Sequence, residues 1–124
     1  MKTGLIILGH GSRIQEAAET LADITATVKK MVPYEEVEYA FFQFSKPDLS
    51  EATNKLIRSG INRIFIIPAL FASGKHLTVD IPQIIDKLKV KNPGVKMYIG
   101  EPLGADLRIV EILLDRIREL ETSI

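Results

Sequence analysis

Short apolar runs alternate with longer amphipathic segments along the whole chain. The runs are typical of strands and cover residues 4–8, 36–44, 62–67 and 95–99. Between and after the runs, apolar residues recur every three or four positions. This spacing predicts helices at residues 13–31, 47–59, 80–91 and 105–120. Strict alternation of strand and helix is typical of βα units, so the pattern predicts an α/β fold with a parallel sheet.

The composition of each predicted strand indicates its place in the sheet. The first and third strands are unbroken apolar runs, as expected where helices cover both faces. The second strand carries Glu36 and Glu38, and the fourth carries Lys96, which is typical of sheet edges. With right-handed crossovers, these features predict one doubly wound, four-stranded parallel sheet in the order 2-1-3-4, with helices on both faces. All of residues 1–124 are expected to form this single domain.

The helical segments allow more detailed predictions. Ser12 and Gln15 have the spacing of a capping box, which would fix the start of the first helix. The inward side of this helix is expected to carry Ile14, Ala17, Ala18, Leu21, Ile24 and Val28. The inward side of the last helix is expected to carry Leu107, Val110, Leu114 and Ile117. Further apolar residues exceed what one sheet face needs, namely Phe42, Phe44, Ile109, Ile112 and Leu113. This surplus predicts a two-fold homodimer.

The chain has only two histidines, His10 and His76, and each follows one of the two predicted central strands. The order 2-1-3-4 changes direction between these strands, which is where open α/β sheets bind ligands. Imidazole favours Co²⁺, Ni²⁺, Fe²⁺ or Zn²⁺ over Mg²⁺ and Ca²⁺. With an unperturbed pKa of about 6.5, it also accepts protons at neutral pH. Two imidazoles predict an open, transient metal site and no permanently bound cofactor.

Other polar residues are expected at the same edge of the sheet. The turn Gly9-His10-Gly11-Ser12-Arg13 precedes a helix and is suited to anions, but Ile14 replaces the third glycine of a dinucleotide fingerprint. Lys46, Lys75 and Arg13 would suit a polyanionic ligand, and Glu101 is a possible accessory carboxylate. The alternative is a tight turn in which His10 only bonds a neighbour.

Composition excludes several classes of function. Lys+Arg and Asp+Glu number 16 each, so no basic surface argues for a nucleic-acid partner. The chain lacks cysteine, which excludes disulfides, Fe–S clusters and cysteine nucleophiles. No apolar stretch approaches the roughly 20 residues of a membrane span. We therefore expect a cytoplasmic protein without a membrane partner.

Three motifs resemble those of the short CbiX-type class II chelatases, relatives of the sirohydrochlorin chelatases. They are Gly9-His10-Gly11-Ser12-Arg13, Gly74-Lys75-His76 with Asp80-Ile81-Pro82, and Gly100-Glu101-Pro102-Leu103-Gly104. The resemblance spans nearly the whole chain. It implies a homodimer that inserts Co²⁺ into sirohydrochlorin without ATP, in early-insertion cobalamin biosynthesis.

The resemblance also implies roles for individual residues. His10 would bind the metal and accept a pyrrole proton, and His76 would be the second metal ligand. The expected substrate-binding residues are Ser12, Arg13, Gln43, Lys46, Phe71, Ala72, Ser73, Gly74, Lys75 and His76. Many members have glutamate where this chain has Gln43, and an amide cannot accept a proton as a carboxylate does.

Three alternatives remain open at the level of sequence. Two imidazoles accept Ni²⁺ or Fe²⁺ as readily as Co²⁺, so the inserted metal could differ. A phosphoryl-transfer enzyme could use His10 as its nucleophile and Arg13 on the phosphate, although it would leave His76 without a role. A carrier of metal or tetrapyrrole could use the same ligands without catalysis.

Overall fold

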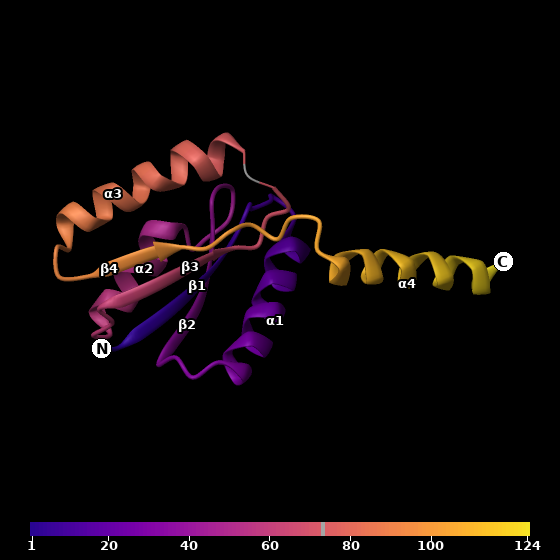
Figure 1. Cartoon of the computed structure of the whole chain (residues 1–124), viewed down its shortest axis with the longest axis horizontal. Coiled ribbons are helices and arrows are strands. Elements are labelled where there is room, and N and C mark those ends of the chain that lie inside the picture. Colours follow the sequence, from indigo (N-terminus) through magenta and orange to yellow (C-terminus); the bar gives the residue numbers. More distant parts are fainter. Residues whose placement is uncertain (73) are drawn as a thin grey trace.

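A computed structural model describes residues 1–72 and 74–124 (Figure 1), so Ser73 and the side chain of His76 lie outside the described residues. The elements in chain order are β1 (Thr3–Gly9), α1 (Gln15–Met31), β2 (Glu36–Phe41), α2 (Leu49–Arg58), β3 (Arg63–Pro68), a π-helical turn η1 (His76–Asp80), α3 (Ile81–Lys91), β4 (Lys96–Ile99) and α4 (Leu107–Ser123). The predicted alternation of strands and helices is confirmed. Among the described residues, no helix combines the length and apolar character needed to cross a bilayer.

The four strands form one parallel sheet in the order β2-β1-β3-β4, which confirms the predicted topology. β1 lies at the centre, where Ile7 is in register with Tyr39 of β2 and Ile67 of β3. Every residue of β1 is buried, because helices cover both of its faces. The strand order leaves the carboxyl ends of β1 and β3 side by side, as expected for a ligand site.

Two hydrophobic clusters hold the helices to the sheet. On one face, α2 and α3 pack against β1 and β3 through residues such as Leu56, Ile85 and Ile64. On the other face, α1 packs over β1 and β2, and Leu21 joins Leu5, Ile7 and their neighbours in one cluster. Helices therefore cover both faces, as predicted, but on the α1 side they cover only half of the sheet.

The predicted packing of the last helix on the sheet is wrong. In Figure 1, α4 extends away from the sheet, and none of its side chains is buried against the described residues. The segment that precedes α4 explains this position. The backbone N–H groups of Leu103 and Gly104 donate to the carbonyl oxygens of Leu70 and Phe71, each at 2.8 Å. Gly104 has φ +66°, so the chain turns outward at the sheet edge before α4 begins. The expected inward residues Leu107, Val110, Leu114 and Ile117 are therefore exposed.

Three local predictions are also wrong. The capping box at Ser12 and Gln15 does not form, because Ile14 is the N-cap of α1 and the Ser12 hydroxyl accepts from the Ile14 N–H at 3.0 Å. Ile14, Ala17 and Ile24 are exposed, since α1 covers only two strands and needs a narrow apolar stripe. β2 ends at Phe41 instead of residue 44, because the chain turns at Phe44, which has φ +66°.

The start of α2 differs slightly from its prediction. The helix begins at Leu49, after an Asp48 N-cap that forms a complete capping box with Glu51. Phe42, one of the apolar residues predicted to exceed what the core needs, packs partly against the core. Phe44 remains exposed, as that prediction required.

Candidate functional site

The turn that follows β1 and the turn that follows β2 lie against each other at the carboxyl edge of the sheet. The Gln43 N–H donates to the His10 carbonyl oxygen at 3.0 Å, and the Ser45 hydroxyl donates to the Ser12 carbonyl oxygen at 2.7 Å. Gly11 has φ +101°, and a Cβ atom at this position would lie 1.5 Å from the Gln43 carbonyl oxygen. Only glycine permits this approach, which fixes the backbone on both sides of His10.

The imidazole of His10 is exposed and contacts polar atoms at both nitrogens. Its Nε2 lies 3.3 Å from Nε2 of Gln43, and its Nδ1 lies 3.4 Å from the Gly11 carbonyl oxygen. An amide nitrogen only donates and a carbonyl oxygen only accepts. This arrangement therefore assigns the lone pair to Nε2 and the proton to Nδ1. Nε2 is the nitrogen that could bind a metal ion once the Gln43 amide moves aside.

An apolar cavity of about 480 Å³ opens beside His10. It is lined by His10, Ala69, Leu70, Phe71, Ala72, Gly74, Leu77 and Leu103. The segment after β3 supplies most of this wall, because the Ala69 N–H donates to the Leu8 carbonyl oxygen at 2.8 Å and extends the pairing with β1. A single imidazole at the edge of an apolar wall suits a flat, largely apolar ligand with a reactive centre.

A second cavity of about 400 Å³ lies on the other side of the paired turns and is more polar. Its lining includes Ser12, Arg13, Phe44, Ser45 and Lys46. The Arg13 guanidinium lies 4.5 Å from the centre of the Phe44 ring, which holds this cation in place.

Lys46 is less available to an anion than the sequence suggests. Its Nζ lies 3.0 Å from Glu51 Oε1 and 3.6 Å from Asp48 Oδ2. The hydrogen bond to Glu51 raises the pKa of Lys46, so the ammonium stays charged while its charge is partly compensated. Arg13 is consequently the principal cation of the polar cavity.

The structure brings most predicted site residues into two groups. His10, Phe71, Ala72 and Gly74 line the apolar cavity, while Ser12, Arg13 and Lys46 line the polar one. Gln43 contacts His10 directly, and Lys75 is exposed next to η1. Within the described residues, no three or more His, Cys, Asp or Glu side chains form a group that could hold a metal ion.

Besides Gln43 and Lys75, three predicted site residues are not placed in either cavity. Ser73 lies outside the described residues, and His76 is described only by its backbone, which begins η1. Glu101 is exposed after β4, and its segment contributes Leu103 to the cavity wall instead.

Some lining residues were not predicted from the sequence. Leu70, Leu77 and Leu103 form part of the apolar wall, and Ser45 forms part of the polar one. Leu103 lies in the glycine-flanked motif at residues 100–104, so the sequence did contain a signal for it. The other three residues have no comparable sequence signal.

Comparisons with known proteins identify the family of this chain. The family model of CbiX matches residues 4–120. The chain belongs to the CbiX family. A sirohydrochlorin cobaltochelatase from Sulfurisphaera tokodaii is 38% identical over 120 residues, covering 97% of this CbiX chain and 95% of the relative. A sirohydrochlorin cobaltochelatase from Methanococcus aeolicus is 32% identical over 136 aligned positions, covering 90% of this chain and 95% of the relative.

Solved structures show the same fold. The sirohydrochlorin chelatase SirB from Bacillus subtilis subspecies spizizenii, in complex with cobalt, superposes with a TM-score of 0.90 at 25% identity. The superposition covers 96% of this CbiX chain but 51% of SirB, so the chain spans about half the length of that protein. A cobalamin biosynthesis CbiX protein from Marinobacter aquaeolei VT8 shares the fold, with a TM-score of 0.80 at 24% identity and 99% of its length covered.

Proposed function

We propose that this CbiX protein is a sirohydrochlorin cobaltochelatase, which inserts Co²⁺ into sirohydrochlorin without ATP in early-insertion cobalamin biosynthesis. The observation that carries the proposal is the imidazole of His10 at the edge of an apolar cavity of about 480 Å³. The relatives from Sulfurisphaera and Methanococcus bear this activity in their names and align with almost the whole chain.

The apolar cavity and the cationic side chains would bind different parts of the substrate. The apolar wall formed by residues such as Leu70 and Leu103 would contact the face of the macrocycle. Sirohydrochlorin carries eight carboxylates, and Arg13 and Lys75 would pair with some of them. Ser12 could donate a hydrogen bond to a carboxylate in the polar cavity.

His10 would act on both the metal and a proton. Insertion exchanges two pyrrole N–H protons for one Co²⁺ ion. We infer that Nε2 of His10 binds Co²⁺ first, with His76 as the second ligand, and releases the ion to the four macrocycle nitrogens. A neutral imidazole holds the ion weakly enough for this transfer, and its vacated lone pair can then accept one of the pyrrole protons. A role for Glu101 as an accessory carboxylate stays a prediction.

We infer that the working form is a cytoplasmic homodimer of two 124-residue chelatase domains. The cavity beside His10 is open, whereas a tetrapyrrole with eight acidic substituents is broad and needs cover on both faces. A two-fold dimer would bring two copies of the His10–His76 site near one axis. The exposed apolar residues of α4 support such an interface.

Anaerobic incubation with sirohydrochlorin and Co²⁺, Ni²⁺ or Fe²⁺ tests the proposal through the absorption change on insertion. We expect Co²⁺ insertion faster than the spontaneous reaction, and loss of that acceleration in His10→Ala. Val90→Ala is the control, because Val90 is exposed on α3 and lines neither cavity. Substrate binding without faster insertion would identify a carrier, and an unchanged rate in folded His10→Ala would contradict the mechanism.

A further inference from the structure

Backbone hydrogen bonds join the turn after β1 to the turn after β2 only as far as His10. The Phe42 N–H donates to the Gly9 carbonyl oxygen at 2.9 Å. The Gln43 N–H donates to the His10 carbonyl oxygen at 3.0 Å, which extends the parallel pairing of the two strands. Gly11, at φ +101°, then takes the chain out of this register. Beyond it, no backbone hydrogen bond links the two turns within residues 1–72 and 74–124.

A side chain joins the two turns where the backbone pairing stops. The Ser45 hydroxyl donates to the Ser12 carbonyl oxygen at 2.7 Å and accepts from the Ser12 N–H at 3.2 Å. A hydroxyl has one proton and two lone pairs, so it can make both bonds at once. One side chain therefore satisfies both backbone polar groups of Ser12 and connects positions that are 33 residues apart in the sequence.

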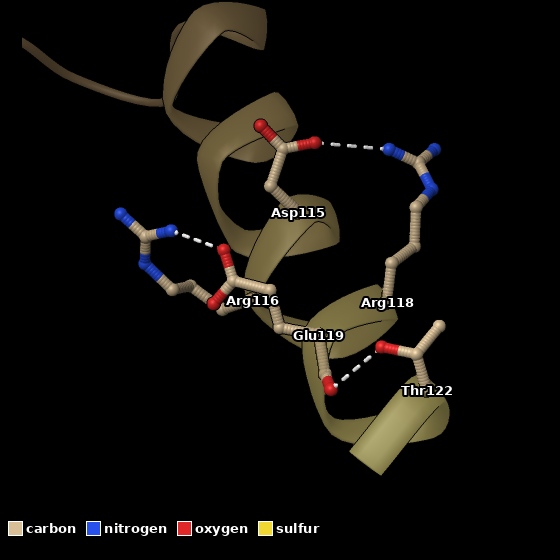
Figure 2. Close-up of polar contacts among 5 residues, drawn as sticks. All are labelled: Asp115, Arg116, Arg118, Glu119 and Thr122. Carbon is tan, nitrogen blue, oxygen red and sulfur yellow. Dashed lines mark hydrogen bonds and ion pairs between the residues drawn. The ribbon is translucent and has the colours of Figure 1, made fainter.

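This contact differs from other hydroxyl contacts in the chain. Several serine and threonine hydroxyls donate to a carbonyl oxygen three or four residues earlier in their own helix, as Thr122 does to Glu119 at 3.1 Å (Figure 2). Such bonds stay within one element and position nothing outside it. The Ser45 hydroxyl is half-buried between two turns that carry different parts of the site.

Ser12 and Ser45 are both close in sequence to the residues that meet at His10 Nε2. Ser12 follows His10 by two positions, and Ser45 follows Gln43 by two positions. Across the turns, Nε2 of Gln43 lies 3.3 Å from Nε2 of His10. The contact of the hydroxyl with Ser12 therefore lies directly beside the contact of the amide with the imidazole.

The backbone between Gln43 and Ser45 needs such a contact to keep its form. Phe44 has φ +66°, in the left-handed region, which costs conformational energy for a residue with a Cβ atom. Its side chain is 57% exposed, so burial in the core does not hold it there. The bonds of Ser45 to the neighbouring turn oppose relaxation of this backbone. If Phe44 relaxed, the peptide that joins it to Gln43 would rotate, and the amide would turn away from His10.

We propose that Ser45 is a positioning residue of the metal site. By binding Ser12, its hydroxyl keeps the turn after β2 in the form that directs the Gln43 amide to Nε2 of His10. This inference rests on the role of His10 in the proposed function. Because the amide and Co²⁺ need the same lone pair, Ser45 acts through Gln43 on how tightly the site holds the ion.

Titration calorimetry with Co²⁺ in the absence of substrate tests this role. Gln43→Leu should bind Co²⁺ about three-fold more tightly, because the hydrogen bond that competes for the lone pair is gone. Ser45→Ala should shift the affinity in the same direction, whereas Ser45→Thr keeps a hydroxyl and should restore the native affinity. Ser59→Ala is the matched control, because its hydroxyl donates to the Lys55 carbonyl oxygen at 3.2 Å, at the end of α2 and outside both cavities.

The double variant Ser45→Ala, Gln43→Leu separates positioning from a merely structural role. If Ser45 acts through Gln43, removing the hydroxyl should change nothing further once the amide is absent. Equal shifts with and without the amide would overturn the proposal, as would a native affinity in Ser45→Ala. Weaker binding in Ser45→Ala would also overturn it, since general loosening of the site weakens binding and does not tighten it.

The imidazole of His10 provides a second measurement that needs no metal ion. The ¹⁵N chemical shifts of the neutral ring report which nitrogen carries the proton. In the native protein we expect the proton on Nδ1, because Nε2 accepts from the Gln43 amide. In Ser45→Ala, the fraction of rings with the proton on Nε2 should rise. An unchanged distribution of the proton would overturn the proposal.

Chelation is measured on the same variants, so that the two proposals can fail separately. Native protein that does not accelerate Co²⁺ insertion, while Ser45→Ala shows both shifts, would contradict the proposed function and support the positioning role. Accelerated insertion by the native protein, with Ser45→Ala identical to it in Co²⁺ affinity and ring protonation, would support the proposed function and overturn the positioning role.

Discussion

At the residue scale, the contact between His10 and Gln43 controls how the site meets a metal ion. The Gln43 amide donates to Nε2, the same nitrogen that would bind Co²⁺, so the amide and the metal compete for one lone pair. A neutral amide also adds no negative charge near the ion. Both effects favour weak binding and ready release, which a chelatase requires.

Gln43→Glu should therefore strengthen the binding of Co²⁺ in the absence of substrate, on the order of ten-fold. A carboxylate can coordinate the ion and adds a negative charge beside His10. Titration calorimetry with Co²⁺ measures the change, with Gln43→Met as the control that keeps the size of the side chain but neither donates nor coordinates as an oxygen ligand. Equal or weaker affinity in Gln43→Glu would contradict this view of the contact.

The place of His10 could be predicted from the sequence, but its surroundings could not. An imidazole directly after a central strand must lie at the carboxyl edge once the strand order is known. The partner Gln43 depends on the turn after β2, which curls back through Phe44 at φ +66° and is held by Ser45. Such irregular backbone leaves no periodic pattern, so the contact becomes visible only in the structure.

At the element scale, α2 contains a buried polar atom without a partner. The Thr53 hydroxyl makes no hydrogen bond to any residue within 1–72 or 74–124, although Thr53 is fully buried. Burying an unpaired hydroxyl costs free energy that a methyl group of the same size avoids.

Thr53→Val should raise the free energy of unfolding by about 1 kcal/mol. The control is Thr25→Val in α1, because the buried Thr25 hydroxyl donates to the Leu21 carbonyl oxygen at 2.8 Å and replacing it brings no such gain. Urea unfolding of both variants measures the difference. A loss of stability in Thr53→Val equal to that in Thr25→Val would show that the Thr53 hydroxyl is satisfied.

The start of β1 is tied to the loop before β2 by an acidic side chain. The Thr3 N–H donates to Glu35 Oε2 at 2.8 Å, and this hydrogen bond lowers the pKa of Glu35. A carboxylate with a lowered pKa in the folded state stabilises the protein above its unfolded pKa. That contribution is lost as the pH falls through the folded pKa.

Glu35→Gln should therefore lower the urea midpoint at neutral pH, and the difference from the native protein should shrink as the pH falls below the unfolded pKa of a glutamate. Glu36→Gln is the neighbouring control, because Glu36 shows no such backbone contact among the described residues. A difference that stays constant from neutral to acidic pH would mean that the carboxylate charge at residue 35 plays no part.

Element types followed from the sequence, whereas some boundaries and one packing partner did not. Apolar runs and helical spacing identified all four strands and the four long helices. The predicted capping box of α1 is wrong, because the Ser12 hydroxyl accepts from the Ile14 N–H and Ile14 itself is the N-cap. For α4, periodicity revealed an apolar side but could not say which surface would cover it.

At the scale of the whole molecule, the strand order of the sheet could be predicted from the sequence, whereas the exposure of part of one sheet face could not. Edge and central strands differ in polarity, so the order 2-1-3-4 could be inferred from the sequence once right-handed crossovers were assumed. The uncovered half of the sheet face on which α1 packs could not be inferred, because a doubly wound topology ordinarily covers both faces with helices of the same chain. Its exposure depends on the outward turn at Gly104.

In the proposed homodimer the exposed apolar residues of α4 form part of the interface, so folding and association are coupled and stability depends on protein concentration. We therefore expect the thermal midpoint to rise by a few degrees for each ten-fold increase in concentration, since ten-fold corresponds to about 1.4 kcal/mol. Ile117→Asp, which places a charge among the exposed apolar residues of α4, should melt at a lower temperature that does not vary with concentration. Scanning calorimetry over two decades of concentration measures both. A native midpoint independent of concentration would mean that each chain is stable alone, and α4 would then be an appendage without a structural role in the dimer.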